Sequence, residues 1–176
     1  PADIVQKVRF WDLAMSSKTT ADYTSGGLLG RTKNGDIVIM DVDRSQREWG
    51  EVEPHIAETA IADGPDVEQA LEAAFYQSSA VTALLKRPEL HNHRIVGVTV
   101  HKDKFTRALP FAARVEAGKV YVLRRSWTQA YLDELCSFPL GKNDDQVDMS
   151  SGAYERLGTT EETKMHAVNP FFGEVD

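Results

Sequence analysis

The strongest structural signal in the sequence is the run Val8-Arg9-Phe10-Trp11-Asp12-Leu13-Ala14-Met15, which is apolar and aromatic and gives way to the polar segment 16–20. Such a run predicts a β-strand, and its apolar character favours a central position in a sheet. Residues two apart in a strand share a face, so Asp12 lies on the otherwise apolar side that carries Phe10. A carboxylate in that setting needs a cationic partner or a metal ion. Asp12 is therefore a candidate for an ion pair or for a metal site.

Two further strands follow, and the rest of the chain alternates between helices and strands. The two strands are expected over 24–31 and 36–44, and the dipeptide Asn34-Gly35 between them is a strong hairpin signal. Apolar periodicity and turn residues then predict helices over 49–63, 79–86, 106–116, 128–137 and 144–157, and strands over 67–72, 94–100 and 119–124. The pattern predicts an α/β domain whose mixed sheet, an antiparallel meander followed by parallel strands, is flanked by helices.

Length and composition fit a single acidic domain. The chain has 176 residues, of which 41% are hydrophobic, and this is enough for one core. We expect the domain to span residues 1–158 and residues 159–176 to form a polar, flexible C-terminal tail. The net charge of −7 argues against a broad basic surface for nucleic acid, although a locally basic groove is compatible with it.

The sequence also carries information on the compartment. Cys136 is the one cysteine, which excludes an internal disulfide and a cysteine-based zinc site and fits a reducing compartment. No apolar run approaches the roughly 20 residues that a membrane-spanning helix needs, and the start of the chain has no signal-peptide pattern. We expect an intracellular protein without a membrane partner, and a start at Pro1 rather than at Met favours an excised domain.

A second acidic feature is the segment Gly141-Lys142-Asn143-Asp144-Asp145-Gln146-Val147-Asp148, which places three carboxylates at the expected start of the last helix. Carboxylates that converge raise one another's pKa unless a cation lies among them, and hard oxygen ligands suit Mg²⁺ or Mn²⁺. The structural alternative is that Asn143 or Asp144 caps the helix while the other acids favour its dipole. Metal-assisted chemistry and helix capping both remain open on this segment alone.

A further acid is expected on a strand next to the first one. Glu68 and Glu72 lie four residues apart in the strand expected over 67–72, and so share a face. Glu72 is the preferred candidate because it stands at the end of the strand, and open α/β sheets place their sites beyond the carboxyl ends of strands. A solvated sheet edge, or a helix through 66–75, is the structural alternative for Glu72.

Five motifs, in order along the chain, resemble the C-terminal nuclease domain of large terminase subunits, the DNA-packaging motors of tailed bacteriophages. They are Phe-Trp-Asp-Leu-Ala at 10–14, Lys-Asp-Lys-Phe-Thr-Arg-Ala at 102–108, Glu-Ala-Gly-Lys-Val at 116–120 with Trp127, Leu-Asp-Glu-Leu-Cys-Ser-Phe-Pro-Leu-Gly at 132–141, and Asp-Asp-Gln-Val-Asp at 144–148. The resemblance covers most of the chain and implies an RNase H-like (RuvC-type) fold.

The resemblance also implies an activity and a site. It implies an endonuclease that cuts concatemeric double-stranded DNA with two divalent metal ions, Mg²⁺ or Mn²⁺. The family's first-strand acid falls on Asp12, and its paired acids near the end fall on Asp144 and Asp145, of which Asp145 is preferred as a catalytic ligand. Glu72 is the candidate for the second-strand acid. Asp148 shares a helix face with Asp144 and Asp145 and is a further candidate metal ligand. The segment 73–79 lacks the glycine that follows the second acid in related sequences, and this departure leaves Glu68 open as a substitute for Glu72.

Partners and location follow from the same resemblance. It implies double-stranded DNA as substrate, the small terminase subunit and the portal as partners, and the host cell cytoplasm as the compartment. The sequence contains no P-loop, so the ATPase domain must belong to another part of the full-length protein. Candidates for holding DNA phosphates, each with surface solubility as the structural alternative, are Lys102, Lys104, Arg107, Lys119, Arg124 and Arg125.

Two rival functions remain. One is a resolvase or RNase H-type enzyme that uses the same acids on branched DNA or on an RNA–DNA hybrid, and the block from Trp127 to Asp148 favours a terminase over it. The other is a non-catalytic docking module of a packaging motor, whose acids cap a helix and balance Lys and Arg. A histidine-based zinc site is not expected, because His91 and His93 lie in a polar loop without metalloprotease spacing.

Overall fold

One mixed sheet organises the chain. The computed structural model describes residues 3–13, 23–72 and 77–165, and its six strands lie in the order β5-β4-β1-β2-β3-β6. The strands are β1 (Ile4–Asp12), β2 (Thr24–Thr32), β3 (Ile37–Ser45), β4 (Glu68–Glu72), β5 (Ile95–Val98) and β6 (Val120–Val122). β1, β2 and β3 pair antiparallel, whereas β4 runs parallel to β1, β5 to β4 and β6 to β3. The expected antiparallel meander followed by parallel strands is confirmed.

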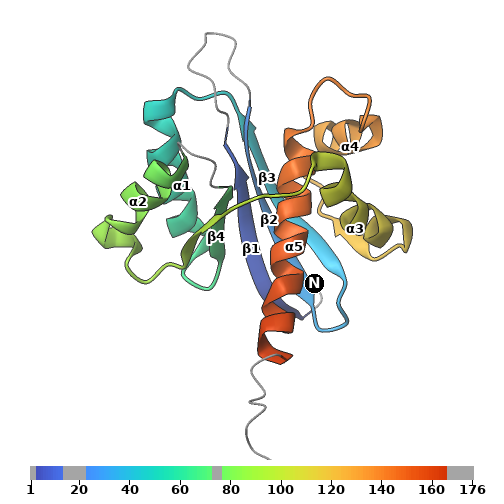
Figure 1. Ribbon diagram of the computed structural model, residues 1–176, viewed down its shortest axis with the longest axis horizontal. Helices are drawn as coiled ribbons and strands as arrows, with labels where there is room; N and C mark the ends of the chain where they lie inside the picture. The colour runs from blue at the N-terminus through green and yellow to red at the C-terminus, as the bar shows by residue number, and fades with distance from the viewer. Residues whose placement is uncertain (1–2, 14–22, 73–76, 166–176) are drawn as a thin grey trace, which may run out of the picture.

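Helices cover both faces of this sheet (Figure 1). α1 (Trp49–Asp63) and α2 (Gln77–Leu85) pack on one face, and α3 (Lys104–Glu116), α4 (Thr128–Ser137) and α5 (Asp145–Met165) pack on the other. A short 3-10 helix, Pro88–Leu90, follows α2. Within the described residues, no helix is both long enough and apolar enough to cross a bilayer.

The element boundaries depart from expectation at both ends of the chain. β1 begins at Ile4, four residues before the expected start, and ends at Asp12; residues 14–22 lie outside the described part of the chain. The last helix was expected to end at residue 157, but α5 continues to Met165. Residues 166–176, the remainder of the expected tail, lie outside the described residues.

Alternation along β1 divides the core into two layers. Phe10 packs with residues of α3, α4 and α5, while its neighbour Trp11 packs with α1 and α2. Asp12 has the parity of Phe10, because successive strand residues point to opposite faces. Its side chain therefore belongs to the face that α5 covers.

α5 crosses β1 at a close approach that requires a glycine. A Cβ atom added to Gly152 would lie 2.4–2.7 Å from ring atoms of Phe10, well inside normal contact distance. Phe10 is fully buried, so its ring has little room to move away. The missing side chain at Gly152 thus allows the N-terminal half of α5 to lie directly on the strand that ends in Asp12.

Replacing Gly152 by alanine tests this packing. We expect Gly152→Ala to lower the free energy of unfolding by about 1–3 kcal/mol, because the added methyl group overpacks the core. Gly158→Ala, in the same helix, is the matched control, because its added Cβ meets nothing within 4 Å. The control should be stabilised by up to about 1 kcal/mol through helix propensity. Urea denaturation of both variants measures the difference, and equal effects would contradict the close approach.

Candidate functional site

The site forms where two parallel strands end. Asp12 is the last residue of β1 and Glu72 is the last residue of β4. Phe10 pairs with Ala70 in the parallel register of these strands, so the two acids, each two residues further on, lie at the same level and on the same face. The side chains of Asp12 and Glu72 are both partly buried. Strand pairing alone thus brings together acids that are 60 residues apart in the chain.

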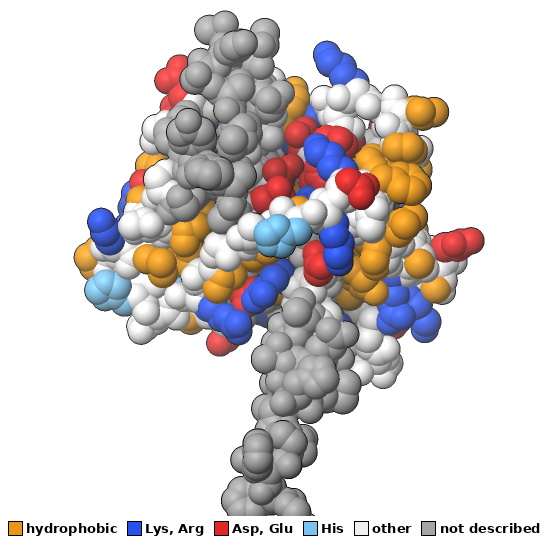
Figure 2. Space-filling model, viewed as in Figure 1, with side chains coloured by type: hydrophobic (Ala, Val, Ile, Leu, Met, Phe, Trp, Pro, Cys, Tyr) orange, Lys and Arg blue, Asp and Glu red, His pale blue; other side chains and the backbone are white. Residues whose placement is uncertain are grey.

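The first turn of α5 brings a second group of acids to the same place. Asp145 opens the helix, Asp144 precedes it, and Asp148 follows one turn later. The Asp148 side chain is only 5% exposed, although Asp144 is more open. Figure 2 shows acidic side chains gathered at this end of the molecule with basic side chains among them. The acids expected from the sequence are therefore neighbours in space.

Burial and mutual repulsion both disfavour the charged forms of these acids. Partial burial raises the pKa of Asp12 to about 8, and the negative charges of Glu72, Asp148 and Asp145 add to this rise, while Lys104 opposes it. Burial, together with the charge of the nearby Glu134, likewise raises the pKa of Asp145. Clusters with pKa values perturbed in this way are typical of functional sites.

Helix α3 places two cations, Lys104 and Arg107, within the acid cluster. Arg107 donates from Nη1 to Glu72 Oε2 at 3.0 Å and from Nη2 to Asp148 Oδ1 at 2.7 Å. Lys104 Nζ lies 2.8 Å from Asp144 Oδ1 and 2.7 Å from Asp148 Oδ2. The two cations thus share Asp148, each taking a different oxygen.

A further acid and a further cation, neither expected from the sequence, hold the start of α5. The buried carboxylate of Glu134 in α4 accepts from the backbone N–H of Gln146 at 2.7 Å and from its side-chain amide at 2.6 Å. Arg44, near the end of β3, lies 3.4 Å from Glu134 and 3.6 Å from Asp145. Glu134 stands within the motif at 132–141, which was the available signal, whereas nothing in the sequence singled out Arg44.

Several other predicted residues lie outside the cluster. Glu68 begins β4, at the opposite end from Glu72, and is buried in ion pairs with Arg94 at 2.8 Å and Arg156 at 2.6 Å. The exposed strip of Lys119, Arg124 and Arg125 flanks β6, which β2 and β3 separate from β1. Arg107, expected on a DNA-binding surface, is instead buried against the acids, with its side chain 4% exposed. Among the residues that the structure describes, no three His, Cys, Asp or Glu side chains are placed to hold a metal ion as they stand.

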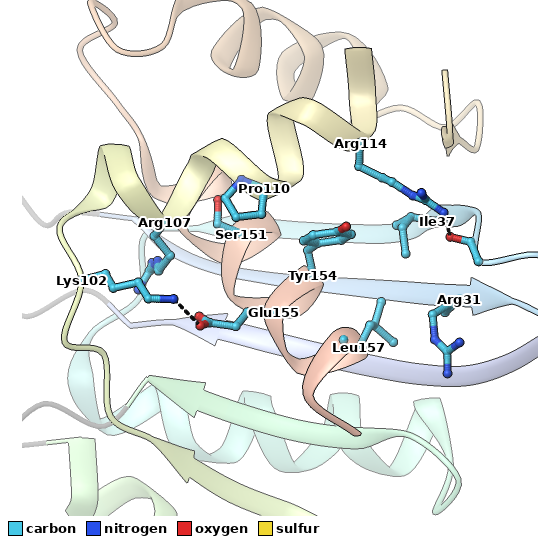
Figure 3. Close-up of a pocket in the computed structure, with 12 residues that line it drawn as sticks. Arg31, Ile37, Lys102, Arg107, Pro110, Arg114, Ser151, Tyr154, Glu155 and Leu157 are labelled. Atoms are coloured by element: carbon cyan, nitrogen blue, oxygen red, sulfur yellow. Dashed lines mark hydrogen bonds and ion pairs between the residues drawn. The ribbon is translucent and has the colours of Figure 1, made fainter. Parts of the chain in front are cut away.

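A basic hollow of about 320 Å³ lies between α3, α5 and the β2–β3 hairpin. Lys102 and Arg107 lie at one end of it, Arg114 lies toward the other, and Tyr154 lies between them (Figure 3). Lys102 is paired with Glu155 at 3.1 Å, and Arg114 donates to the carbonyl of Gly35 at 2.5 Å. The basic side chains of this hollow are thus engaged with acidic or carbonyl oxygens of the chain.

Comparisons with known proteins concern the family and the fold. The family of terminase RNaseH-like domains matches residues 9–157. The solved nuclease domain of the human cytomegalovirus terminase, Mn-soaked and inhibitor-bound, has a TM-score of 0.68 and 15% identity, covering 88% of this chain and 83% of that one. A comparison with curated proteins gives no match.

Holliday junction resolvases share the architecture more distantly. The yeast mitochondrial resolvase has a TM-score of 0.56 and 12% identity, covering 94% of this chain and 86% of that one. The fowlpox virus resolvase, solved with Holliday junction DNA, has a TM-score of 0.54 and 13% identity, covering 90% of this chain and 99% of that one. At these identities the likeness concerns the fold, and the expected RNase H-like fold is confirmed.

The raised pKa of Asp12 predicts how the stability of the metal-free domain depends on pH. In the folded state Asp12 keeps its proton up to a pKa of about 8, whereas in the unfolded chain it loses the proton near pH 4. The unfolded state is therefore favoured increasingly as the pH rises from about 4 to about 8. Asp12→Asn abolishes this contribution, and we expect the variant to be more stable than the wild type by about 2–5 kcal/mol at pH 8, with little difference at pH 4.

Urea denaturation in EDTA across this pH range measures the effect. The exposed Asp133 offers a matched control, because Asp133→Asn removes the same charge away from the cluster. The control should follow the wild-type pH dependence. An Asp12→Asn variant that is no more stable than the wild type at pH 8 would contradict the proposed burial of unbalanced charge.

Proposed function

The chain belongs to the family of terminase RNaseH-like domains, and from this membership we propose that it is the metal-dependent endonuclease domain of a viral DNA-packaging terminase. The observation that carries the proposal is the convergence of Asp12, Glu72 and the acids of α5 at one end of the sheet. Its substrate would be concatemeric double-stranded DNA, and its reaction the hydrolysis of a phosphodiester bond.

The donor chemistry of the acids suits divalent metal ions. All of the proposed ligands are carboxylates, the hard oxygen donors that Mg²⁺ and Mn²⁺ prefer. Burial and mutual repulsion raise the pKa of Asp12, and a bound cation would relieve both by stabilising the charged carboxylates. We assign Asp12, Glu72 and Asp145 as catalytic ligands, and Asp144 and Asp148 as further ligands, of two Mg²⁺ or Mn²⁺ ions. The Mn soak of the related cytomegalovirus domain supports divalent metal use.

The proposed reaction depends on bound metal ions and on the strands and helix that hold their ligands. When bound, two divalent ions supply an activated water for in-line attack and neutralise charge on the leaving oxygen. Asp12 and Glu72 stand on rigid strands, which fix the ligand geometry, and α5 holds Asp145 and Asp148 against them. No side-chain nucleophile is needed for this chemistry.

Basic residues around the cluster would hold the DNA backbone. Lys102 and Lys104 are exposed close to the acids and are assigned to phosphate contacts, while Lys119, Arg124 and Arg125 form a second strip along the β6 edge. Arg107 is excluded from this group by its burial among the acids. The metal ions would reverse the local sign of the field, which allows an acidic domain to bind DNA at its active site.

The wider setting of the activity is proposed from the family. A packaging nuclease would act in the cytoplasm of a phage-infected bacterium, together with an ATPase domain of the same full-length protein, the small terminase subunit and the portal. A resolvase-type activity on branched DNA is the second candidate, supported by the fold shared with the fowlpox virus resolvase.

Cleavage assays test the proposal. Plasmid DNA, a four-way junction and an RNA–DNA hybrid are each incubated with the domain and Mg²⁺ or Mn²⁺, beside an EDTA control. We expect metal-dependent cutting of the plasmid, and a loss of more than about 100-fold in Asp12→Asn, Glu72→Gln and Asp145→Asn, because each change removes a ligand charge. Preference for the junction or the hybrid would favour the resolvase or RNase H alternative.

Glu68→Gln is the matched control for Glu72→Gln. Both changes neutralise a glutamate of β4, but Glu68 is paired with Arg94 and Arg156, away from Asp12. The control should keep the cutting rate and lose stability instead. Loss of cutting in Glu68→Gln with retention in Glu72→Gln would reverse the assignment of the second acid, and undiminished cutting by Asp12→Asn would identify a contaminating nuclease.

A further inference from the structure

The two cations that α3 places in the acid cluster differ in burial and in the oxygens that they contact. Arg107 has a side chain only 4% exposed, whereas the side chain of Lys104 is 58% exposed. Asp148 separates them, because its Oδ1 accepts from Arg107 and its Oδ2 contacts Lys104. Each carboxylate oxygen of this buried acid therefore has its own cation.

Arg107 joins ligands from two different elements. Its two terminal nitrogens reach Glu72 of β4 and Asp148 of α5, and Nη2 also donates to the Asp148 backbone carbonyl at 3.2 Å. A planar guanidinium holds two carboxylates in a fixed relation, which an ammonium group does not do. The contacts take Oε2 of Glu72 and Oδ1 of Asp148, and leave one oxygen of each acid to another partner. Arg107 thus supports the ligands from the buried side.

Lys104 lies on the open side of the same acids. Its ammonium contacts one oxygen of Asp144 and one oxygen of Asp148 at 2.7–2.8 Å, so a single positive charge bridges two proposed ligands. Asp103 caps α3 by accepting from the backbone N–H of Thr106, which fixes the Lys104 backbone, while the long side chain can still move. An ion that uses Asp148 Oδ2 needs the oxygen that Lys104 occupies.

We propose that these two cations have opposite effects on the affinity for a divalent metal ion. Arg107 is a positioning residue that raises the affinity by orienting the carboxylates of Glu72 and Asp148. Lys104 lowers the affinity, because a metal ion must displace its ammonium group from Asp144 and Asp148. The inference rests on the proposed function, because it concerns the same acids. The displaced ammonium becomes free for a DNA phosphate at the rim of the site. Metal binding and the release of Lys104 to the substrate are then coupled.

Mn²⁺ titration of the metal-free domain, without DNA and followed by calorimetry, tests the proposal. Lys104→Met should bind Mn²⁺ at least about 3-fold more tightly, because the competitor is gone. Arg107→Lys keeps the positive charge but cannot donate to both carboxylates in the fixed geometry of a guanidinium. This variant should bind Mn²⁺ about 10–100-fold more weakly, which is the usual effect of changing a residue that orients metal ligands. Arg107→Gln, whose amide can still donate to one carboxylate, is the second variant at this position if Arg107→Lys does not fold.

Lys102→Met is the matched control for charge. Lys102 lies two residues from Lys104 and is paired with Glu155 instead of the site acids, so its removal should change the Mn²⁺ affinity by less than about 2-fold. Shifts of the same sign in Lys104→Met and the Arg107 variants, or equal shifts in Lys104→Met and Lys102→Met, would overturn the inference alone. A wild-type domain that binds no Mn²⁺ would overturn the proposed function together with it.

Discussion

Repulsion between carboxylates at one end of the sheet is the constraint on which the rest of the site depends. Asp12 and Glu72 are held at the same level by the parallel pairing of β1 and β4, and α5 adds Asp148 to them. Bringing buried like charges together costs free energy, which hydrophobic packing elsewhere in the domain must offset. Arg107 and Lys104 relieve part of that cost, and both come from α3. The position of α3 beside α5 is therefore an electrostatic requirement as well as a packing arrangement.

Packing in the core and hydrogen bonds from α4 fix the position of α5. Gly152 lets α5 lie against Phe10, and Glu134 fixes the first turn of α5 through Gln146. The helix that carries Asp145 and Asp148 is thus held by apolar contact with Phe10 and by hydrogen bonds at its start. Acids on a mobile segment would move apart because they repel one another, whereas these acids are held in place by the strands and by α5.

Local patterns predicted most of the elements, because they depend on neighbouring residues. Such patterns predicted the Asn34-Gly35 turn and the bounds of α1, and they identified Asp12 as a candidate site residue. The role of Arg107 could not be predicted in this way: its burial depends on α3 meeting β4 and α5, which are 35 and 41 residues distant. The end of α5 was misjudged because the polar composition beyond Gly158 resembles a tail, although strong helix formers are present there.

The opposite face of the sheet shows why the acid cluster differs from an ordinary buried ion pair. Arg9, 2% exposed, donates to Asp63 at 2.6 Å and to Asp41 at 2.9 Å, and Gln69 also donates to Asp63. In that network the buried guanidinium of Arg9 forms ion pairs with Asp63 and Asp41, so its positive charge is neutralised by nearby carboxylates. Burial, together with the negative charges of Glu72, Asp148 and Asp145, raises the pKa of Asp12. The Arg9 network holds β1 to α1, whereas the acid cluster brings together carboxylates from β1, β4 and α5 and has the perturbed pKa values that are typical of functional sites.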